Sequence, residues 1–217
     1  MDQKAIKKQA RELIKGKFND LFTPVLFILV VGLFTSSISD YFIKNSTSGN
    51  FSFMIENQKF IFSLWQPLFD LVVSIINTPL FIGYIAFILA FIRKQKTDLK
   101  IIFSYYKDWY RIALVVIVSK LFIMAGLILI IPGIIISLGL AMNEFIMADH
   151  KFKLKLVLKK SWSLMHGYKW NYLVFILSFL PWVILSFFTF GILFVWVIPY
   201  IMVSLSLYYE KLNKIKK

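Results

Sequence analysis

Long apolar runs separated by short basic segments are the dominant pattern of this 217-residue chain. Most of these runs approach or exceed the roughly 20 apolar residues that a helix needs to cross a bilayer. The pattern therefore predicts an all-α polytopic membrane protein in which residues 1–217 form a single integral-membrane domain. Its six predicted transmembrane helices cover about residues 21–43, 65–92, 112–131, 132–149, 171–189 and 191–209.

The second apolar run is too long for one straight span. A continuous helix over residues 60–92 would measure about 50 Å, against a hydrocarbon core of about 30 Å. Counting back about 20 residues from the basic residue Arg93 puts the outer boundary of the membrane near Val73. We therefore expect Asp70 at the outer interface and a water-exposed loop over residues 44–59.

Three basic segments carry apolar residues at helical spacing. They are residues 1–18, where Ile6 and Ala10 belong to the stripe, residues 93–111 and residues 151–169. An apolar stripe among lysines and arginines is typical of a helix that lies on a membrane surface. We therefore predict three basic amphipathic helices on the cytoplasmic surface.

The distribution of basic residues gives an orientation. Of the 25 Lys and Arg residues, 22 lie in these three segments or after Glu210, and only Lys44 and Lys59 lie between spans on the other side. Because basic residues are enriched in cytoplasmic loops, we predict a plasma-membrane protein with both termini cytoplasmic. The net charge of +14 then suits anionic lipid headgroups, and we expect no nucleic-acid partner.

Motifs of catalysis and metal binding are missing from the sequence. The chain has no cysteine, and His150 and His166 stand at no spacing that is typical of metal ligands. It also lacks a GxSxG turn, a Walker loop and a Gly-rich dinucleotide turn. We therefore expect a protein that is not an enzyme and that holds no cofactor or metal.

Two ionisable residues lie inside predicted spans. Lys120 precedes Pro132 by twelve residues and Glu144 follows it by twelve, so a hairpin that turns at Pro132–Gly133 would bring them to one depth. A charge in the membrane interior is costly, which favours an ion pair between them. The pair could fix helix register or line a path for a proton, an ion or a substrate. Alternatively, the lysine could reach the interface on its own.

The second predicted span has a polar face. Asp70, Ser74, Asn77 and Tyr84 lie within about 80° of one another on a helical wheel, and Ser137 adds a hydroxyl on the hairpin's second arm. These side chains could line an outward-facing cavity. Alternatively, Ser74 and Asn77 compensate for the backbone hydrogen bond that Pro79 removes and bond to neighbouring helices.

The predicted cytoplasmic surface offers five further candidates, namely Lys159, Lys160, His166, Lys169 and Trp170. Lysines near a membrane attract anionic headgroups, and a Lys–Trp pair is typical of an interface anchor. We expect these residues to touch lipid phosphate or a partner protein.

A weak internal repeat links two of the basic segments. Leu13-Ile14-x-Gly16 matches Leu164-Met165-x-Gly167, and each precedes a predicted span. Repeats of this kind occur in transporters, which bind substrate between them. Surface helices can also look alike simply because the interface demands the same composition.

Several short motifs also resemble a known family. They are Ile131-Pro132-Gly133, the sequence NEFIMAD ending at Asp149, LKKSWSLMHGYKW from Leu158 to Trp170, and Pro199-Tyr200. Together they resemble the bacterial integral-membrane family catalogued as domain of unknown function 975. The resemblance implies six spans and a plasma-membrane location, and it carries over no catalytic residue.

These observations lead to three functional hypotheses. The first is a non-enzymatic protein that binds or senses lipid or a membrane partner, with bacteriocin self-immunity as one concrete form. The second is a small transporter or lipid translocator with a path past Asn77, Lys120 and Glu144. The third is an accessory subunit of a lipid-handling enzyme or an exporter. The partner in each case would be lipid, another membrane protein or a second copy of the chain.

Overall fold

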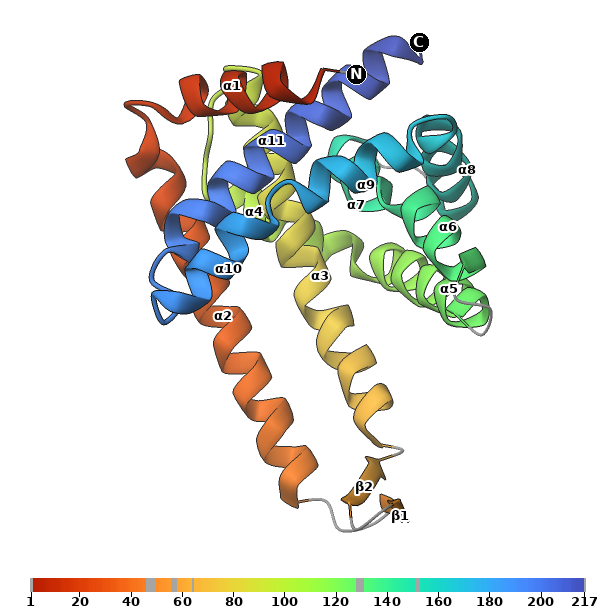
Figure 1. Cartoon of the computed structure of the whole chain (residues 1–217). Helices are drawn as coiled ribbons and strands as arrows, with labels where there is room; N and C mark the ends of the chain where they lie inside the picture. The colour runs from red at the N-terminus through yellow and green to blue at the C-terminus, as the bar shows by residue number, and fades with distance from the viewer. Residues whose placement is uncertain are drawn as a thin grey trace.

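A computed structural model describes residues 2–45, 50–55, 58–63, 65–127, 131–150 and 153–216. The chain begins with α1 (Gln3–Ile14) and α2 (Phe18–Asn45), and after a two-stranded hairpin it returns through α3 (Trp65–Ile92). Helices α2 and α3 run side by side, and both termini lie at the end of the molecule opposite the hairpin (Figure 1).

The fold is helical, as predicted, apart from one two-stranded hairpin that was not predicted. β1 (Asn50–Ile55) pairs antiparallel with β2 (Gln58–Ser63), and Asn50 stands opposite Ser63. We had placed residues 44–59 in a loop and begun the apolar run at residue 60. The segment from Asn50 alternates polar and aromatic or aliphatic residues with a period of two, which is a strand signal. The neighbouring apolar run obscured it.

After α3 the described ranges are mainly helical, and the chain is divided into several helices. Its elements are α4 (Lys100–Ser104), the 3₁₀ turn η1 (Tyr105–Asp108), α5 (Trp109–Leu127), α6 (Ile131–Leu140), α7 (Asn143–Asp149), α8 (Leu154–Met165), α9 (Lys169–Leu177), α10 (Leu180–Phe188) and α11 (Phe194–Ile215). α5 packs against α6, so the predicted central hairpin exists. Pro132 and Gly133 fall in the first turn of α6.

Five helical segments are long and apolar enough to cross a membrane. They cover residues 18–38, 69–92, 100–126, 131–149 and 169–188. The sixth predicted span, residues 191–209, corresponds mainly to α11, which begins at Phe194 and is not one of the five. That helix continues into the charged sequence after Tyr209, which lowers its mean hydropathy.

Helix α2 exposes an unusual amount of apolar surface. Leu33 is 67% exposed and Phe34 66% exposed, and Val30 is 56% exposed. A protein that lives in water rarely presents a continuous apolar patch of this kind. The exposed side chains and the apolar spans together define a multi-pass membrane protein.

Helix α3 lies at the centre of the packing. Ile82, Ile85 and Ile88 are fully buried, and the helix packs against α2, α4, α5, α7 and α11. The fold is thus centred on α3.

Basic amphipathic helices form at both α1 and α8, but their stripes face the protein. Ile6 and Ala10 are fully buried, and α1 packs along α11. Lys7 Nζ donates to the carbonyl of Ser178 at 3.3 Å. Helix α8 packs against α5, α6 and α7 and buries Val157 and Ser161. The prediction that these stripes lie on lipid therefore does not hold for their buried residues.

The predicted repeat is reproduced in backbone geometry. α1 and α8 both have 12 residues. Each ends at an extended residue followed by a glycine in the left-handed region, Gly16 at φ +79° and Gly167 at φ +82°. Each of these turns is closed by a 3.0 Å hydrogen bond, Lys17 N to Ile14 O and Tyr168 N to Met165 O. The two segments are one local structure used twice.

Candidate functional site

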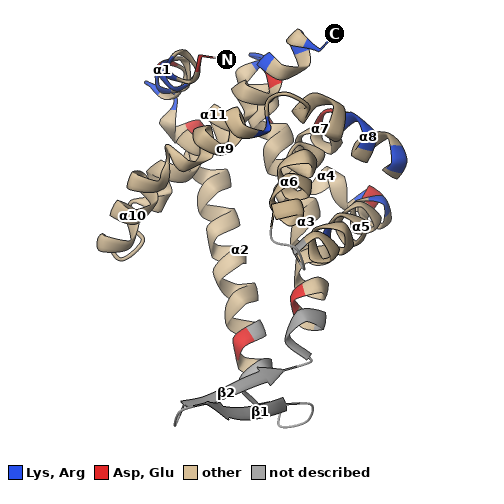
Figure 2. Ribbon diagram, turned by 45° about the vertical axis from the view of Figure 1, so that its right-hand side comes forward, with Lys and Arg blue, Asp and Glu red and all other residues tan. Residues whose placement is uncertain are grey.

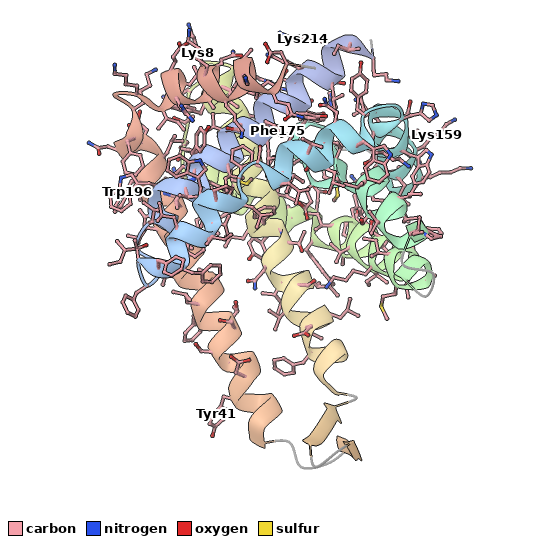
Figure 3. The ribbon with its side chains drawn as sticks, viewed as in Figure 1. Lys8, Tyr41, Lys159, Phe175, Trp196 and Lys214 are labelled. Carbon is pink, nitrogen blue, oxygen red and sulfur yellow. The ribbon has the colours of Figure 1, made fainter. Side chains whose placement is uncertain are left out.

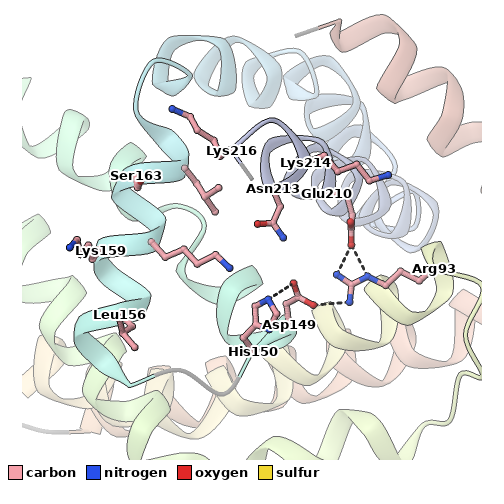
Figure 4. Close-up of a pocket in the computed structure, with 12 residues that line it drawn as sticks. Arg93, Asp149, His150, Leu156, Lys159, Ser163, Glu210, Asn213, Lys214 and Lys216 are labelled. Carbon is pink, nitrogen blue, oxygen red and sulfur yellow. Dashed lines mark hydrogen bonds and ion pairs between the residues drawn. The ribbon is translucent and has the colours of Figure 1, made fainter.

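An ion-pair cluster joins three helices near the end that carries both termini. Arg93 Nη1 lies 2.7 Å from Asp149 Oδ1, and Arg93 Nη2 lies 2.6 Å from Glu210 Oε1 (Figure 4). Tyr209 donates its hydroxyl to Asp149 Oδ2 at 3.0 Å. The hydrogen bond to Asp149 is the largest influence that raises the pKa of Arg93, the bond to Glu210 adds to it, and burial opposes both. The cluster ties the end of α3 to α7 and α11.

A hollow of about 720 Å³ opens beside this cluster, and we call it the basic hollow. Helices α8 and α11 form its facing walls (Figure 4). Its charged lining consists of five basic and two acidic side chains, together with His150: Arg93, Lys159, Lys160, Lys214, Lys216, Asp149 and Glu210. Both acidic side chains bond to Arg93. The hollow therefore has an excess of positive charge.

A second hollow of about 430 Å³ continues from the first, since both are lined by Lys159, Ser163 and Lys216. His166 and Trp162 complete its wall. Lys169 Nζ lies 3.6 Å from the centre of the Trp162 ring, a cation–π contact.

The five predicted surface candidates divide between these hollows and the surface beside them. Lys159, Lys160 and His166 line the hollows, and Lys169 covers the ring of Trp162. Trp170 is 71% exposed and lines neither hollow. Figure 3 shows Lys159 and Lys214 in the upper half of the view, with Tyr41 at the far end of α2.

Charge is distributed unevenly between the two ends of the molecule. In Figure 2 the basic residues gather on α1, on α8 and toward the C-terminus. The charged residues drawn on the hairpin-side ends of α2 and α3 are acidic. A hollow of about 300 Å³ near that end is lined by Asp40 and Asp70.

The predicted ion pair between Lys120 and Glu144 is not formed. Lys120 Nζ instead donates to Ser74 Oγ on α3 at 2.6 Å. Glu144 makes no hydrogen bond or ion pair with any residue that the structure describes. The two residues do line one cavity of about 330 Å³, which we call the central cavity. Its polar lining is Ser74, Thr78, Ser119, Lys120, Ser137, Asn143 and Glu144.

A break in the second arm of the hairpin explains the difference. Helix α6 ends at Leu140 and α7 begins at Asn143, so Glu144 does not continue the helix of Ser137. Ser161 holds the break, because its hydroxyl donates to Gly139 O at 2.9 Å and accepts from Met142 N at 3.2 Å. A Cβ on Gly139 would lie 2.4 Å from the ring of Trp162, so the close approach of α8 requires glycine there.

The predicted polar face of α3 separates into different environments. Asn77 Nδ2 donates to Thr35 Oγ1 on α2 at 3.0 Å, so Asn77 and Ser74 both bond to neighbouring helices. Asp70 and Asp40 both line the hollow of about 300 Å³ near the hairpin end, which we call the outer hollow. Tyr84 is 1% exposed and lines no cavity described here, and its hydroxyl has no hydrogen-bond partner in the part of the chain that the structure describes.

Several residues of these sites were not predicted from the sequence. Arg93, Asp149 and Glu210 are far apart in the chain, and each looked like an ordinary charge at the end of an apolar run. Ser161 and Ser119 are equally inconspicuous. The signal for Arg93 was its position directly after a span, but nothing in the sequence indicated its two acidic partners.

A core centred on one apolar helix, an exposed apolar surface and an internal polar cavity define a multi-pass membrane protein with a basic hollow at one end. The chain belongs to the family described as Protein of unknown function (DUF975), whose family model matches residues 100–216. The resemblance noted from the motifs is thereby confirmed. No curated protein and no solved structure matches the chain.

Proposed function

We propose that this plasma-membrane protein, with both termini in the cytoplasm, acts without catalysis by binding the anionic headgroup of a phospholipid in the basic hollow. The single observation that carries the proposal is the hollow's lining, in which Lys159, Lys160, Lys214 and Lys216 surround a space whose two acidic residues already bond to Arg93.

The chemistry of the lining favours a phosphate group. Each lysine ammonium offers three donors and no acceptor, which suits the oxygens of a phosphodiester. Lysines near an anionic bilayer contribute about 1 kcal/mol each to its attraction. A hollow of about 720 Å³ lies within the range of small-molecule sites, roughly 300–1,000 Å³. Trp162 and Lys169 beside it are an aromatic residue and a cation of the kind found at membrane interfaces.

Loss of charge in the hollow tests the proposal. The double substitution Lys159→Gln and Lys160→Gln is expected to weaken binding of a short-chain phosphatidylglycerol by roughly tenfold, because two ammonium groups near the phosphate are removed. Binding is measured by titrating the purified full-length protein in a neutral detergent. Short-chain phosphatidylcholine, which has no net charge, is expected to bind much less tightly.

A matched variant distinguishes binding in the hollow from attraction to the overall positive charge of the protein. Lys96→Gln with Lys100→Gln removes the same charge from exposed positions that do not line the hollow. This variant is expected to bind within about twofold of the wild type, because neither lysine lines the hollow and solvent-exposed charges are screened by salt. Equal losses in both variants, or equal affinity for the two lipids, would contradict the proposal.

A second candidate, translocation of a lipid or small solute, is favoured by a chain of overlapping cavities. The central cavity shares Ser74 and Thr78 with a neighbouring cavity of about 240 Å³, and that one shares Gly32 and Asn77 with the outer hollow of Asp70. Polar residues within spans are typical of such routes. This candidate keeps the predicted path past Asn77, Lys120 and Glu144.

Its test is movement across a membrane. In vesicles that carry the protein and a fluorescent phosphatidylethanolamine, Glu144→Gln is expected to slow exchange between leaflets at least tenfold, as measured by dithionite quenching. Ser104→Ala is the control, because Ser104 lines none of these cavities and its hydroxyl donates to Ile101 O. Unchanged exchange in the Glu144 variant would remove this residue from the route.

A further inference from the structure

We propose that the central cavity is a binding site for a small zwitterionic group, in which an ammonium lies at Glu144 and an acid group lies at Lys120. The inference concerns a different site from the basic hollow and does not depend on headgroup binding there. It deepens the translocation candidate by naming the class of ligand that the cavity would hold.

The positive end of the site is Lys120. Its ammonium has three donors, and the bond to Ser74 Oγ at 2.6 Å uses one of them. Ser74 and Lys120 both line the cavity, so the remaining donors are held beside the open space. A carboxylate or phosphate in the cavity could accept from them without disturbing the bond to α3.

The negative end is formed by two adjacent residues of α7. Glu144 lines the cavity and has neither a hydrogen bond nor an ion pair with the described residues. Asn143 is 5% exposed, and its Nδ2 donates to Ser119 Oγ at 2.9 Å. Its Oδ1 is buried without a partner in the described part of the chain. An acceptor buried in this way costs free energy, which a donor from a ligand would recover.

The arrangement as a whole distinguishes a zwitterion from a simple ion. A single cation would find acceptors at Glu144 and Asn143 but would be repelled by the ammonium of Lys120. A single anion would find donors at Lys120 but would be repelled by the carboxylate of Glu144. Opposite charges that share a cavity of about 330 Å³ without an ion pair are satisfied together by a ligand that carries both. The helix break between α6 and α7 is the kind of discontinuity that forms ligand sites in membrane proteins.

The ligand chemistry could come from a free solute or from a lipid headgroup. Phosphoethanolamine is the soluble probe, with ethanolamine and inorganic phosphate as the two half-ligands. For the lipid source, the protein is placed in nanodiscs of phosphatidylglycerol with and without phosphatidylethanolamine. Binding is followed by isothermal titration in the first arm and by thermal stability in the second, both with the full-length protein.

We expect phosphoethanolamine to bind at least tenfold more tightly than either half-ligand, or phosphatidylethanolamine to raise the melting temperature, which then identifies the lipid as the source. Glu144→Gln and Lys120→Gln should each reduce that response at least tenfold or abolish the shift. Ser104→Ala should leave it within twofold, because Ser104 does not line the cavity and its hydroxyl donates to Ile101 O.

Size-exclusion profiles and melting temperatures of the unliganded variants show whether they are folded. If Lys120→Gln fails to fold, the conservative Lys120→Arg takes its place and is expected to retain binding. No response to either source, or ethanolamine binding that is indifferent to Lys120, would overturn the proposal. If the wild-type protein binds the ligand but does not accelerate exchange between leaflets, translocation is contradicted and the binding site still stands.

Discussion

Replacing Gly83 by alanine is expected to lower the melting temperature of the detergent-solubilised protein by roughly 10 °C, or to prevent folding. A Cβ built at Gly83 would lie 2.1 Å from the carbonyl oxygen of Ile102 and 2.7 Å from its Cα. Both are backbone atoms of α4, so no rotamer change can relieve the overlap. Overpacking of this kind typically costs about 1–3 kcal/mol, and more where the neighbour cannot move.

The alternative to strain is displacement of α4 from α3. Ile102 is 1% exposed, and Tyr106 just beyond it donates its hydroxyl to Ile76 O at 3.0 Å. Displacing α4 would expose Ile102 and break the hydrogen bond from Tyr106 to Ile76 O. Gly32→Ala is the matched control, because nothing lies within 4 Å of a Cβ at that position in α2. If the two variants melted at the same temperature, the close approach of α3 and α4 would be wrong.

Replacing Arg93 by methionine is expected to destabilise the protein by roughly 2–3 kcal/mol, which makes it the second large effect. The substitution leaves Asp149, whose side chain is 6% exposed, without its cation at 2.7 Å. It also leaves the carboxylate of Glu210 without the guanidinium that separates it from Asp149. The figure is smaller than for a fully buried pair because Arg93 itself is 33% exposed. Thermal unfolding in detergent measures it.

Arg111→Met serves as the comparison for this variant. Arg111 is 44% exposed and lies 3.8 Å from Asp108 within one helical turn. Exposed pairs contribute about 0–1 kcal/mol, so this loss should be small. A second comparison is Arg93→Met combined with Asp149→Asn, which removes the buried charge and is expected to recover part of the stability. Equal stability of Arg93→Met and Arg111→Met would show that the cluster does not hold α3, α7 and α11 together.

The sequence predicted the apolar helices well because their length and composition are local properties. It placed the second span at residues 65–92, which are the bounds of α3. It could not predict that Lys120 bonds to Ser74, because equal spacing from Pro132 implies equal depth only if both arms are continuous helices. The break after Leu140 depends on Ser161 from a later helix. That contact has no trace in the local pattern.

The predicted surface residues also combine a local feature that could be predicted from the sequence with a long-range one that could not. A run of lysines with an apolar stripe predicted α8, and Lys159 and Lys160 do line the basic hollow. The hollow exists only because α11 brings Lys214 and Lys216 opposite them, and such long-range pairing cannot be read from spacing. The hairpin of β1 and β2 was missed for another reason. Residues 44–59, which include β1, were predicted as a loop. The apolar positions of β2 from residue 60 merge with the run that follows, so they were assigned to that run.

The paired turns at Gly16 and Gly167 have a consequence for the way the chain enters the membrane. Each turn is closed by a bond between residues three apart, so it can form as soon as its own segment has been synthesised. Each turn leads the chain from a basic amphipathic helix, α1 or α8, into an apolar one, α2 or α9. The chain thus begins two of its apolar helices through the same local geometry. For α1 this local geometry can be complete before α11, the helix against which its buried face packs, has been synthesised.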